Sequence, residues 1–205
     1  MMRTWTGLLL SLAIFLAAET TLAAPAAGPR GAVEAAVARF MTIVQNGQAG
    51  GTAVAERDAE IREIVRDMFD FDEISKRALS RHWQTLQIDE QAEFVPLFRD
   101  LLERAYLTQV ESVGSEQIIF LDESIDAVGS ATVRSKVITR HGSEIPLDYR
   151  LHVLGGTWRI YDVIVQGVSF IASYRTQFDR VIRAESYSGL RERLQKKATE
   201  TTAQR

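Results

Sequence analysis

The side chains best suited to catalysis or metal binding are few and widely spaced. The 205-residue chain contains no cysteine and three histidines. The lack of cysteine excludes thiolate nucleophiles, iron–sulfur clusters and cysteine zinc sites. His82 lies near the end of a predicted helix, His141 in a predicted turn, and His152 on the polar face of a predicted strand. None lies beside an obvious nucleophile or at metal-ligand spacing, so we expect no metal site and no catalytic histidine.

Serine and carboxylate patterns do not indicate a hydrolase either. Ser169 follows a predicted strand in Gly167-Val168-Ser169, but the second glycine that a nucleophile elbow requires is missing. Asp70, Asp72 and Glu73 form an acidic cluster, and helix capping explains such a cluster, with Asp72 as the expected cap. These motifs therefore assign no catalytic residue.

One carboxylate, that of Asp162, is predicted to be buried. The segment Leu154–Thr157 contains Gly-Gly, which predicts a two-residue hairpin loop because both central positions require positive φ. The resulting register pairs Leu151 with Ile160 and Tyr149 with Asp162, and it places Asp162 on the apolar face of the sheet. A buried aspartate must be paired or protonated. Asp162 is thus either held by a structural partner, such as an arginine or a backbone amide, or serves as a general acid or base in a cavity.

The preceding hairpin is predicted to have a loop with an odd number of residues. A two-residue loop at His141-Gly142 would place Arg134 and Lys136 on the apolar face of the sheet. A three-residue loop at 141–143 instead pairs Val137 with Leu147 and keeps the charged side chains in water. We therefore predict the three-residue loop.

The spacing of apolar residues predicts the elements that position these side chains. Apolar residues recur at helical spacing in 33–44, 61–68, 72–80, 89–106, 169–182 and 190–197. Alternating patterns rich in β-branched and aromatic residues predict four strands, at Gln117–Leu121, Ala131–Thr139, Ile145–Leu154 and Thr157–Val165. This order predicts one α+β domain, with N-terminal helices, an antiparallel meander of about four strands and C-terminal helices.

Both ends of the chain differ in composition from this domain. Residues 1–26 combine Arg3 with the apolar run Leu8–Ala18 and small residues, which is typical of a cleaved secretory signal peptide. We expect a single folded domain at 27–197 and a disordered tail at 198–205. The lack of cysteine, and hence of disulfides, favours export to a bacterial periplasm. The formal net charge of −3 argues against nucleic-acid binding.

Three segments together resemble the MlaC family, the periplasmic phospholipid-binding component of the system also known from toluene tolerance. They are Phe69–Leu79, Gln91–Leu107 and Trp158–Ile182, and the likeness covers roughly residues 55–197. The resemblance implies helices and a sheet that enclose a deep apolar pocket, with acyl chains inside and the head group near solvent. It also implies that the protein shuttles phospholipid between an outer-membrane lipoprotein complex and an inner-membrane ABC transporter with an MCE subunit, which maintains outer-membrane lipid asymmetry.

Under this resemblance the expected ligand is a phospholipid, with no cofactor, no metal and no catalytic residue. The candidate lipid-binding residues are Phe94, Phe98, Leu101, Tyr106, Leu147, Tyr149, Leu151, Ile160, Val163 and Val168. The segment 169–197 carries seven basic and three acidic residues, so Arg175, Arg180 and Arg183 are candidates for docking to the partners, unless they only form a solvated helix face. Three different functions also fit the sequence: a hopanoid-associated carrier of the same family, a small exported enzyme with an Asp162-centred pocket, and a structural envelope protein without a ligand.

Overall fold

The computed structural model describes residues 27–48, 54–107 and 116–202, so the predicted signal peptide lies outside the described residues. Four helices and one short 3₁₀ helix precede the strands: α1 (Pro29–Gln48), α2 (Val54–Met68), α3 (Phe71–Leu79), η1 (Ser80–Thr85) and α4 (Ile88–Leu107). The strands are β1 (Gln117–Ile125), β2 (Ala131–Ile138), β3 (Glu144–Leu154), β4 (Thr157–Val165) and β5 (Val168–Ser169), and α5 (Phe170–Thr202) follows. The predicted α+β class and order of elements are confirmed. Among the described residues, no helix is long and apolar enough to cross a membrane.

The five strands form one antiparallel meander in the order β1-β2-β3-β4-β5. The sequence does not predict the two-residue strand β5, because Val168–Ser169 is too short to show an alternating pattern. It pairs with the end of β4 and leads directly into α5. The chain therefore passes from the end of β4 through β5 into α5 between Val165 and Phe170.

The register of the β3–β4 hairpin agrees with the prediction near the turn and departs from it further on. Leu151 pairs with Ile160 as expected, but a β-bulge follows, so that Arg150 pairs with Asp162 and Tyr149 pairs with Val163. The predicted pairing of Tyr149 with Asp162 is wrong. An extra residue in one strand reverses the faces of all residues beyond it, and Asp162 therefore lies on the face of Arg150.

The β2–β3 hairpin has a loop of odd length, as predicted, but in a different place. The Thr139 amide donates to the Ser143 carbonyl at 3.0 Å, which leaves a three-residue loop at 140–142. Val137 pairs with Ile145 and not with Leu147, so the predicted register is wrong by two residues. A shift of two residues keeps every side chain on its face, and the apolar residues still point to the core.

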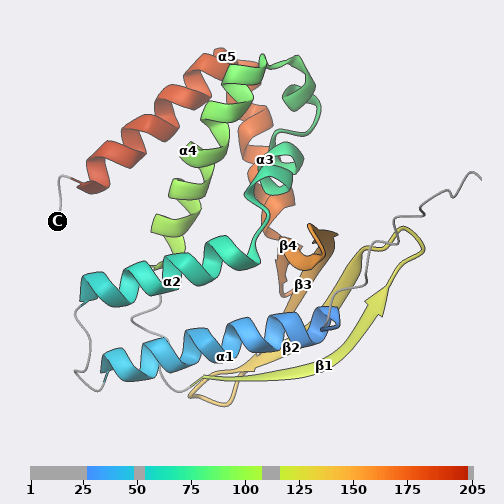
Figure 1. Ribbon diagram of the computed structural model, residues 1–205. Coiled ribbons are helices and arrows are strands. Elements are labelled where there is room, and N and C mark those ends of the chain that lie inside the picture. The colour runs from blue at the N-terminus through green and yellow to red at the C-terminus, as the bar shows by residue number, and fades with distance from the viewer. Residues whose placement is uncertain (1–26, 49–53, 108–115, 203–205) are drawn as a thin grey trace, which may run out of the picture.

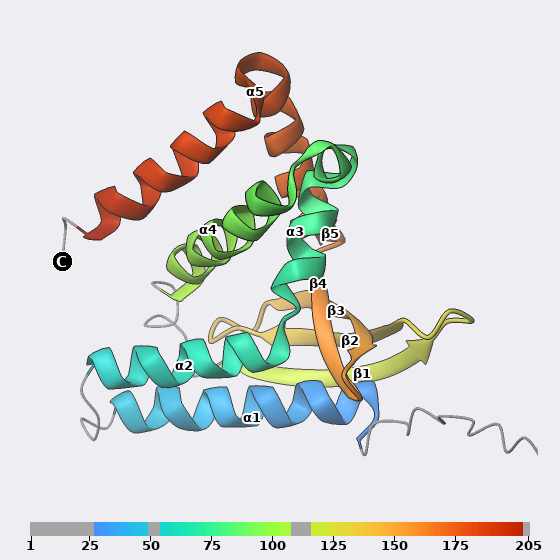
Figure 2. The same ribbon diagram turned by 45° about the horizontal axis from the view of Figure 1, so that its top comes forward.

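The helices form two groups around the sheet (Figures 1 and 2). In both views α1 and α2 lie side by side, with α1 along β1 and β2, while α3, α4 and α5 form the other group. Helix α5 consists of two arms, because Ser186 has φ of 68° and interrupts the helix. The second arm continues through residues 198–202, where the sequence predicts a disordered tail, and residues 203–205 lie outside the described residues.

Two main apolar clusters hold these groups together. The first joins α3, α4 and α5 around Phe94, Phe98 and Phe178. The second joins α1 to the sheet around Val33 and Leu151. A smaller cluster lies between α1 and α2. The space where the three clusters meet is only partly filled by side chains.

Candidate functional site

An apolar cavity of about 430 Å³ lies between the helices and the sheet. Its volume falls within the range of about 300–1,000 Å³ that is common for small-molecule sites. Residues from α1, α2, α3, α4, β3, β4, α5 and the α2–α3 junction line it, and all are apolar or aromatic except two carboxylates. The lining residues are Phe40, Ile61, Val65, Phe69, Phe71, Ile74, Leu102, Glu103, Leu147, Tyr149, Asp162, Val163, Phe170 and Ile171.

Three of the predicted lipid-binding residues, Leu147, Tyr149 and Val163, line this cavity. The β-bulge explains how they come together, since it returns Val163 to the face that carries Tyr149. Burial raises the pKa of the Tyr149 phenol from 10.0 to about 12, which a hydrogen bond with Ser135 partly opposes. The phenol therefore stays neutral in the cavity wall.

The rest of the predicted lipid-binding residues lie elsewhere. Phe94 and Phe98 are fully buried in the cluster of α3, α4 and α5, where Leu101 packs against them. Leu151 and Ile160 are buried in the cluster of α1 and the sheet. The remaining two are Val168, which is 61% exposed on β5, and Tyr106, which lies in the last turn of α4 with its side chain outside the described part.

The sequence patterns missed the contributions of α2 and of the α2–α3 junction. Ile61 and Val65 lie on the apolar stripe of α2, and their periodicity predicted burial but not burial against a cavity. Phe69 and Phe71 flank Asp70, with ring centroids 6.1 Å apart, and both rings line the cavity. The sequence signal that could have indicated Phe69 and Phe71 as wall residues is their position on either side of the helix cap Asp70.

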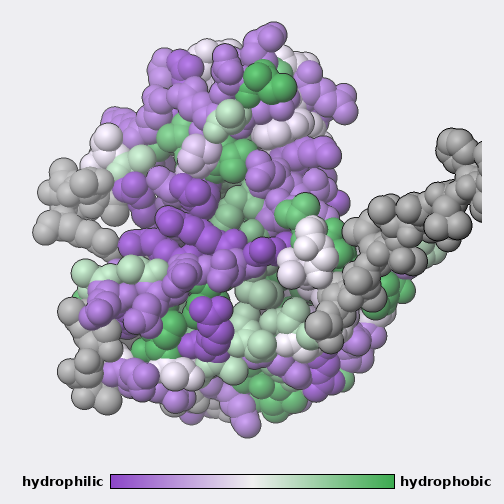
Figure 3. Space-filling model, in the orientation of Figure 1, coloured by the Kyte–Doolittle hydropathy of each residue, from purple (hydrophilic) through white to green (hydrophobic). Residues whose placement is uncertain are grey.

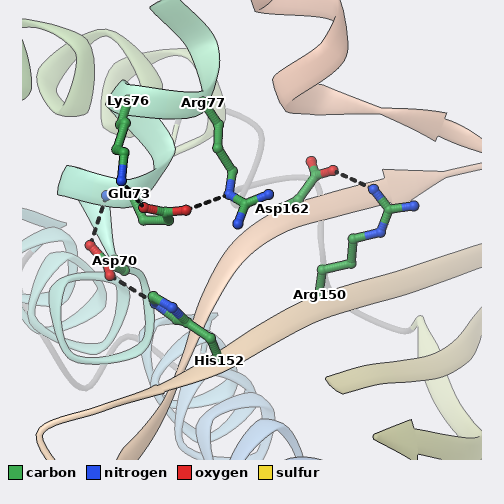
Figure 4. Close-up of polar contacts among 7 residues, drawn as sticks. All are labelled: Asp70, Glu73, Lys76, Arg77, Arg150, His152 and Asp162. Atoms are coloured by element: carbon green, nitrogen blue, oxygen red, sulfur yellow. Dashed lines mark hydrogen bonds and ion pairs between the residues drawn. The ribbon is translucent and has the colours of Figure 1, made fainter. Parts of the chain in front are cut away.

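A hydrogen-bonded pair holds this junction against the sheet (Figure 4). Asp70 is the N-cap of α3: its Oδ1 accepts from the Glu73 amide at 2.9 Å, which corrects the prediction of Asp72. Asp70 Oδ2 lies 2.8 Å from His152 Nε2 on β3, and the Asp70 amide donates to the Ile160 carbonyl at 2.9 Å. His152 thus has a structural contact that positions the wall residues Phe69 and Phe71.

One of the two carboxylates of the cavity, Glu103 on α4, is buried among arginines. Its Oε1 lies 3.1 Å from Arg66 Nε and 3.7 Å from Arg99 Nε, and its Oε2 lies 3.6 Å from Arg62 Nε. These ion pairs bridge α2 to α4 at one end of the cavity. Figure 3 shows that hydrophilic residues form a band over α2 across this face of the molecule.

The second carboxylate, Asp162, is also held by structural partners. Ser169 Oγ donates to Oδ2 at 2.7 Å, the Ile171 amide donates to Oδ1 at 3.2 Å, and Arg150 Nη1 lies 3.4 Å from Oδ2. An arginine and a backbone amide, the structural partners considered for a buried aspartate, are therefore both in contact with Asp162. Asp162 fixes the start of α5 at the end of β4.

The three predicted docking arginines lie in the first arm of α5 but in different settings. Arg175 lines a second recess, on the side of Asp162, and Arg180 is exposed. Arg183 Nε lies 2.9 Å from Asp179 Oδ2, and His82 Nε2 lies 2.8 Å from Asp179 Oδ1. The hydrogen bond from His82, with smaller contributions from Arg81 and Arg183, lowers the pKa of Asp179 from 3.8 to about 2. Part of the predicted basic surface is therefore neutralised by its own carboxylate.

Within the described part of the chain, no group of three or more histidine, cysteine or carboxylate side chains is arranged to hold a metal ion. The site is thus an apolar cavity whose two lining carboxylates, Glu103 and Asp162, are both bound by neighbouring groups of the protein. Such a cavity is suited to holding an apolar ligand by exclusion of water.

Comparisons with known proteins agree with this geometry. A family model described as "MlaC protein" matches residues 34–196. The toluene tolerance protein ttg2D of Pseudomonas putida is 27% identical over 119 residues, which are 58% of this chain and 55% of that protein. The chain thus matches about half the length of this curated relative.

A solved structure shares the fold. It is that of a phospholipid-binding protein from Ralstonia solanacearum in complex with a phospholipid. The two structures superpose with a TM-score of 0.75 at 22% sequence identity, covering 85% of this chain and 98% of that chain. The likeness establishes a shared fold for nearly the whole of that protein.

Proposed function

The chain belongs to the MlaC family, because residues 34–196 match the model of that family. We propose that the protein is a periplasmic phospholipid carrier. The observation that carries this proposal is the apolar cavity of about 430 Å³, whose walls come from helices and sheet together. The fold shared with the phospholipid-bound Ralstonia protein and the relation to a toluene tolerance protein support it.

Apolar walls suffice to hold a lipid. Burying about 14 methylenes of one acyl chain at about 0.8 kcal/mol each contributes roughly 11 kcal/mol before the costs of ordering. The cavity therefore needs no specific polar contact to bind the chains, and Leu147, Tyr149, Val163, Phe69 and Phe71 supply the required surface. Release into water is correspondingly slow, so delivery requires a partner that opens the cavity.

The proposed partners are those of the family. We propose that the carrier shuttles phospholipid between an outer-membrane lipoprotein complex and an inner-membrane ABC transporter with an MCE subunit. This transport would maintain the lipid asymmetry of the outer membrane. Arg175, Arg180 and Arg183, which are exposed on the first arm of α5, are proposed to contact acidic surfaces of these partners. Charge complementarity of this kind mainly raises the rate of encounter and sets the register of docking.

The experiment that tests the proposal is native mass spectrometry, with lipid extraction, of protein purified from the periplasm without detergent. A bound phospholipid is the expected result. A bound hopanoid would assign the chain to the hopanoid-associated branch of the family. Protein that is empty, and that also fails to take phospholipid from vesicles, would refute the carrier and favour a structural or enzymatic role.

A further inference from the structure

A second recess, here called the basic recess, lies on the other face of β3 and β4 from the apolar cavity. Its volume is about 360 Å³, and α3, η1, β3, β4 and the start of α5 surround it. Neighbouring residues of a strand point to opposite faces, and accordingly Tyr149 of β3 lines the cavity while Arg150 lines the basic recess. The buried residues Asp162 and Ile171 form a wall that the two sites share. The basic recess is therefore separate from the site proposed for the lipid.

The basic recess carries more positive than negative charge. Its four cations come from three elements: Lys76 and Arg77 on α3, Arg150 on β3 and Arg175 on α5. The carboxylates beside them are those of Asp162 and Glu73, and Glu73 lies 2.7 Å from Arg77 and 3.6 Å from Lys76. Figure 4 shows Arg77 and Arg150 on either side of Asp162. Like charges gathered in this way repel one another, and a bound anion would relieve that repulsion.

The positive charge continues beyond the basic recess along η1 and α5. Arg81 follows the lining residue Ser80, and Arg183 lies about two turns after Arg175 on α5. Both Arg81 and Arg183 contact one carboxylate, that of Asp179, so the two arginines keep an excess of one positive charge. The chain as a whole has a formal net charge of −3. A basic surface on an acidic protein favours an acidic partner, because opposite potentials attract before contact is made.

Two of the four cations remain available to an anion from outside. Within the part of the chain that the structure describes, Arg175 has no ion-pair partner. Arg150 Nη1 makes only a long contact of 3.4 Å with Asp162 Oδ2, and the Arg150 side chain is 47% exposed. Asp162 also accepts hydrogen bonds from Ser169 Oγ and from the Ile171 amide. Arg150 can therefore turn to another anion while the buried carboxylate keeps two hydrogen bonds.

Aromatic side chains beside these cations favour a protein side chain as the occupant. The Arg77 guanidinium lies over the Tyr161 ring, 4.0 Å from its centroid, and Trp83 lines the same recess. A stacked guanidinium presents planar donors that suit the two oxygens of one carboxylate, and the rings offer apolar contact to the methylene groups that carry it. Arginine, tyrosine and tryptophan are also the residues that contribute most to binding at protein interfaces. Such a recess suits a side chain that projects from a partner, whereas a bilayer surface is too flat to enter it.

We infer that the basic recess is the pocket in which a partner protein of the carrier anchors an acidic side chain. An aspartate or glutamate of that partner binds Arg150 and Arg175, and the stacked Arg77 completes the pocket. The inference rests on the proposed function and deepens it, because it names the residue type of the partner and adds α3 and β3 to the docking surface. Arg180 and Arg183 lie outside the basic recess and assist the encounter. Since the recess and the cavity lie on opposite faces of β3 and β4, the carrier can dock while its lipid is still bound.

The test measures how fast the loaded carrier associates with and dissociates from its proposed partners. The periplasmic domain of the MCE subunit and the outer-membrane lipoprotein complex are each immobilised on a biosensor, and protein loaded with phosphatidylglycerol is passed over them. The double variant Arg150→Gln, Arg175→Gln is expected to dissociate about tenfold faster or more from at least one of them, because it loses charge-assisted hydrogen bonds made only in the complex. Arg180→Gln combined with Arg183→Gln should instead slow association, most strongly at low salt.

The matched control, Arg30→Gln combined with Arg39→Gln, removes two charges from α1, where the side chains are 41% and 58% exposed and line neither site. It should keep the wild-type dissociation rates, and circular dichroism and lipid extraction should show that all variants are folded and loaded. Unchanged dissociation of the recess double variant from both partners would overturn the inference and leave the carrier intact. Wild-type protein that holds lipid but binds neither partner would overturn it too, whereas protein that holds no lipid would refute the proposed function.

A second measurement identifies the occupant without altering a charged residue. A photoreactive amino acid replaces Gln84, an exposed residue of the recess lining, and the crosslinked peptide of each partner is sequenced by mass spectrometry. The captured peptide is expected to carry an aspartate or glutamate, and changing that residue to its amide should add little to the effect of the double variant Arg150→Gln, Arg175→Gln. Captured peptides without an acidic residue would contradict the inference. So would a double variant that keeps both partners but loses binding to phosphatidylglycerol vesicles, because the recess would then serve the membrane surface.

Discussion

Replacing Val163 by tryptophan is the substitution that best separates an open cavity from a solid core. Val163 lies on β4, pairs with Tyr149 and lines the apolar cavity. The indole is expected to enter the cavity and to take the place of part of an acyl chain. Leu151→Trp is the matched control, since Leu151 lies on the same apolar face but is 0% exposed in a closed cluster.

The two substitutions should change the free energy of unfolding in opposite directions. An indole in the cavity buries about 100 Å² more apolar surface than valine, which at about 25 cal/mol per Å² stabilises the lipid-free protein by at most ~2.5 kcal/mol. The same indole at Leu151 overpacks the cluster and is expected to cost about 1–3 kcal/mol. If the indole at Val163 excludes about four methylenes of lipid, affinity falls by about 3 kcal/mol, a factor of more than 100.

Urea unfolding of delipidated protein gives the first quantity, and lipid titration gives the second. We expect Val163→Trp to unfold at the same urea concentration as the wild type or higher and to lose most of its lipid. A Val163→Trp protein that is destabilised as much as Leu151→Trp would show that the face is solid core. One that keeps its full lipid content would show that lipid binds elsewhere.

Three further predictions concern the charged and titratable groups. Arg180→Glu combined with Arg183→Glu should lower crosslinking to both partner complexes and leave lipid content unchanged, and unchanged crosslinking would make this helix face merely solvated. Asp179 has a pKa of about 2, so its stabilising effect is present above its ordinary pKa of 3.8 and is lost as the pH falls towards 2. Asp179→Asn should therefore make the unfolding midpoint less dependent on pH over that range, and a variant with the same pH dependence as the wild type would contradict the assignment. Tyr149 has a pKa of about 12, so its contribution is present below pH 10 and is lost as the pH rises to 12; Tyr149→Phe should be less sensitive to alkaline unfolding over that range, and equal sensitivity would place the phenol outside the buried wall.

The elements and the class of the fold could be predicted because each depends on local periodicity. The alternating pattern of 145–154 and the Gly155-Gly156 turn placed Leu151 opposite Ile160 correctly. The β-bulge after that pair could not be predicted, because Tyr161, Val163 and Ile164 give both faces of β4 apolar residues beyond Ile160. A slip of one residue therefore changes little in the pattern except the face on which Asp162 lies.

The site was less predictable than the fold because burial and lining have the same signature in sequence. Phe94, Phe98 and Leu151 are as apolar and as regularly spaced as Leu147 and Val163, yet only the latter two face the cavity. Whether a stripe meets another stripe or an open space depends on the angles at which whole elements pack. A closed core therefore could not be distinguished from a cavity before the structure was known.

The most direct test of the account is to find where the acyl chain lies. Protein loaded with a phospholipid that carries a photoreactive diazirine in its acyl chain is irradiated, and the crosslinked peptides are identified by mass spectrometry. We expect crosslinks to the strands and helices that line the cavity, around Leu147, Val163, Val65 and Phe71. Crosslinks confined to exposed surfaces, such as the segment around Val168, would contradict it.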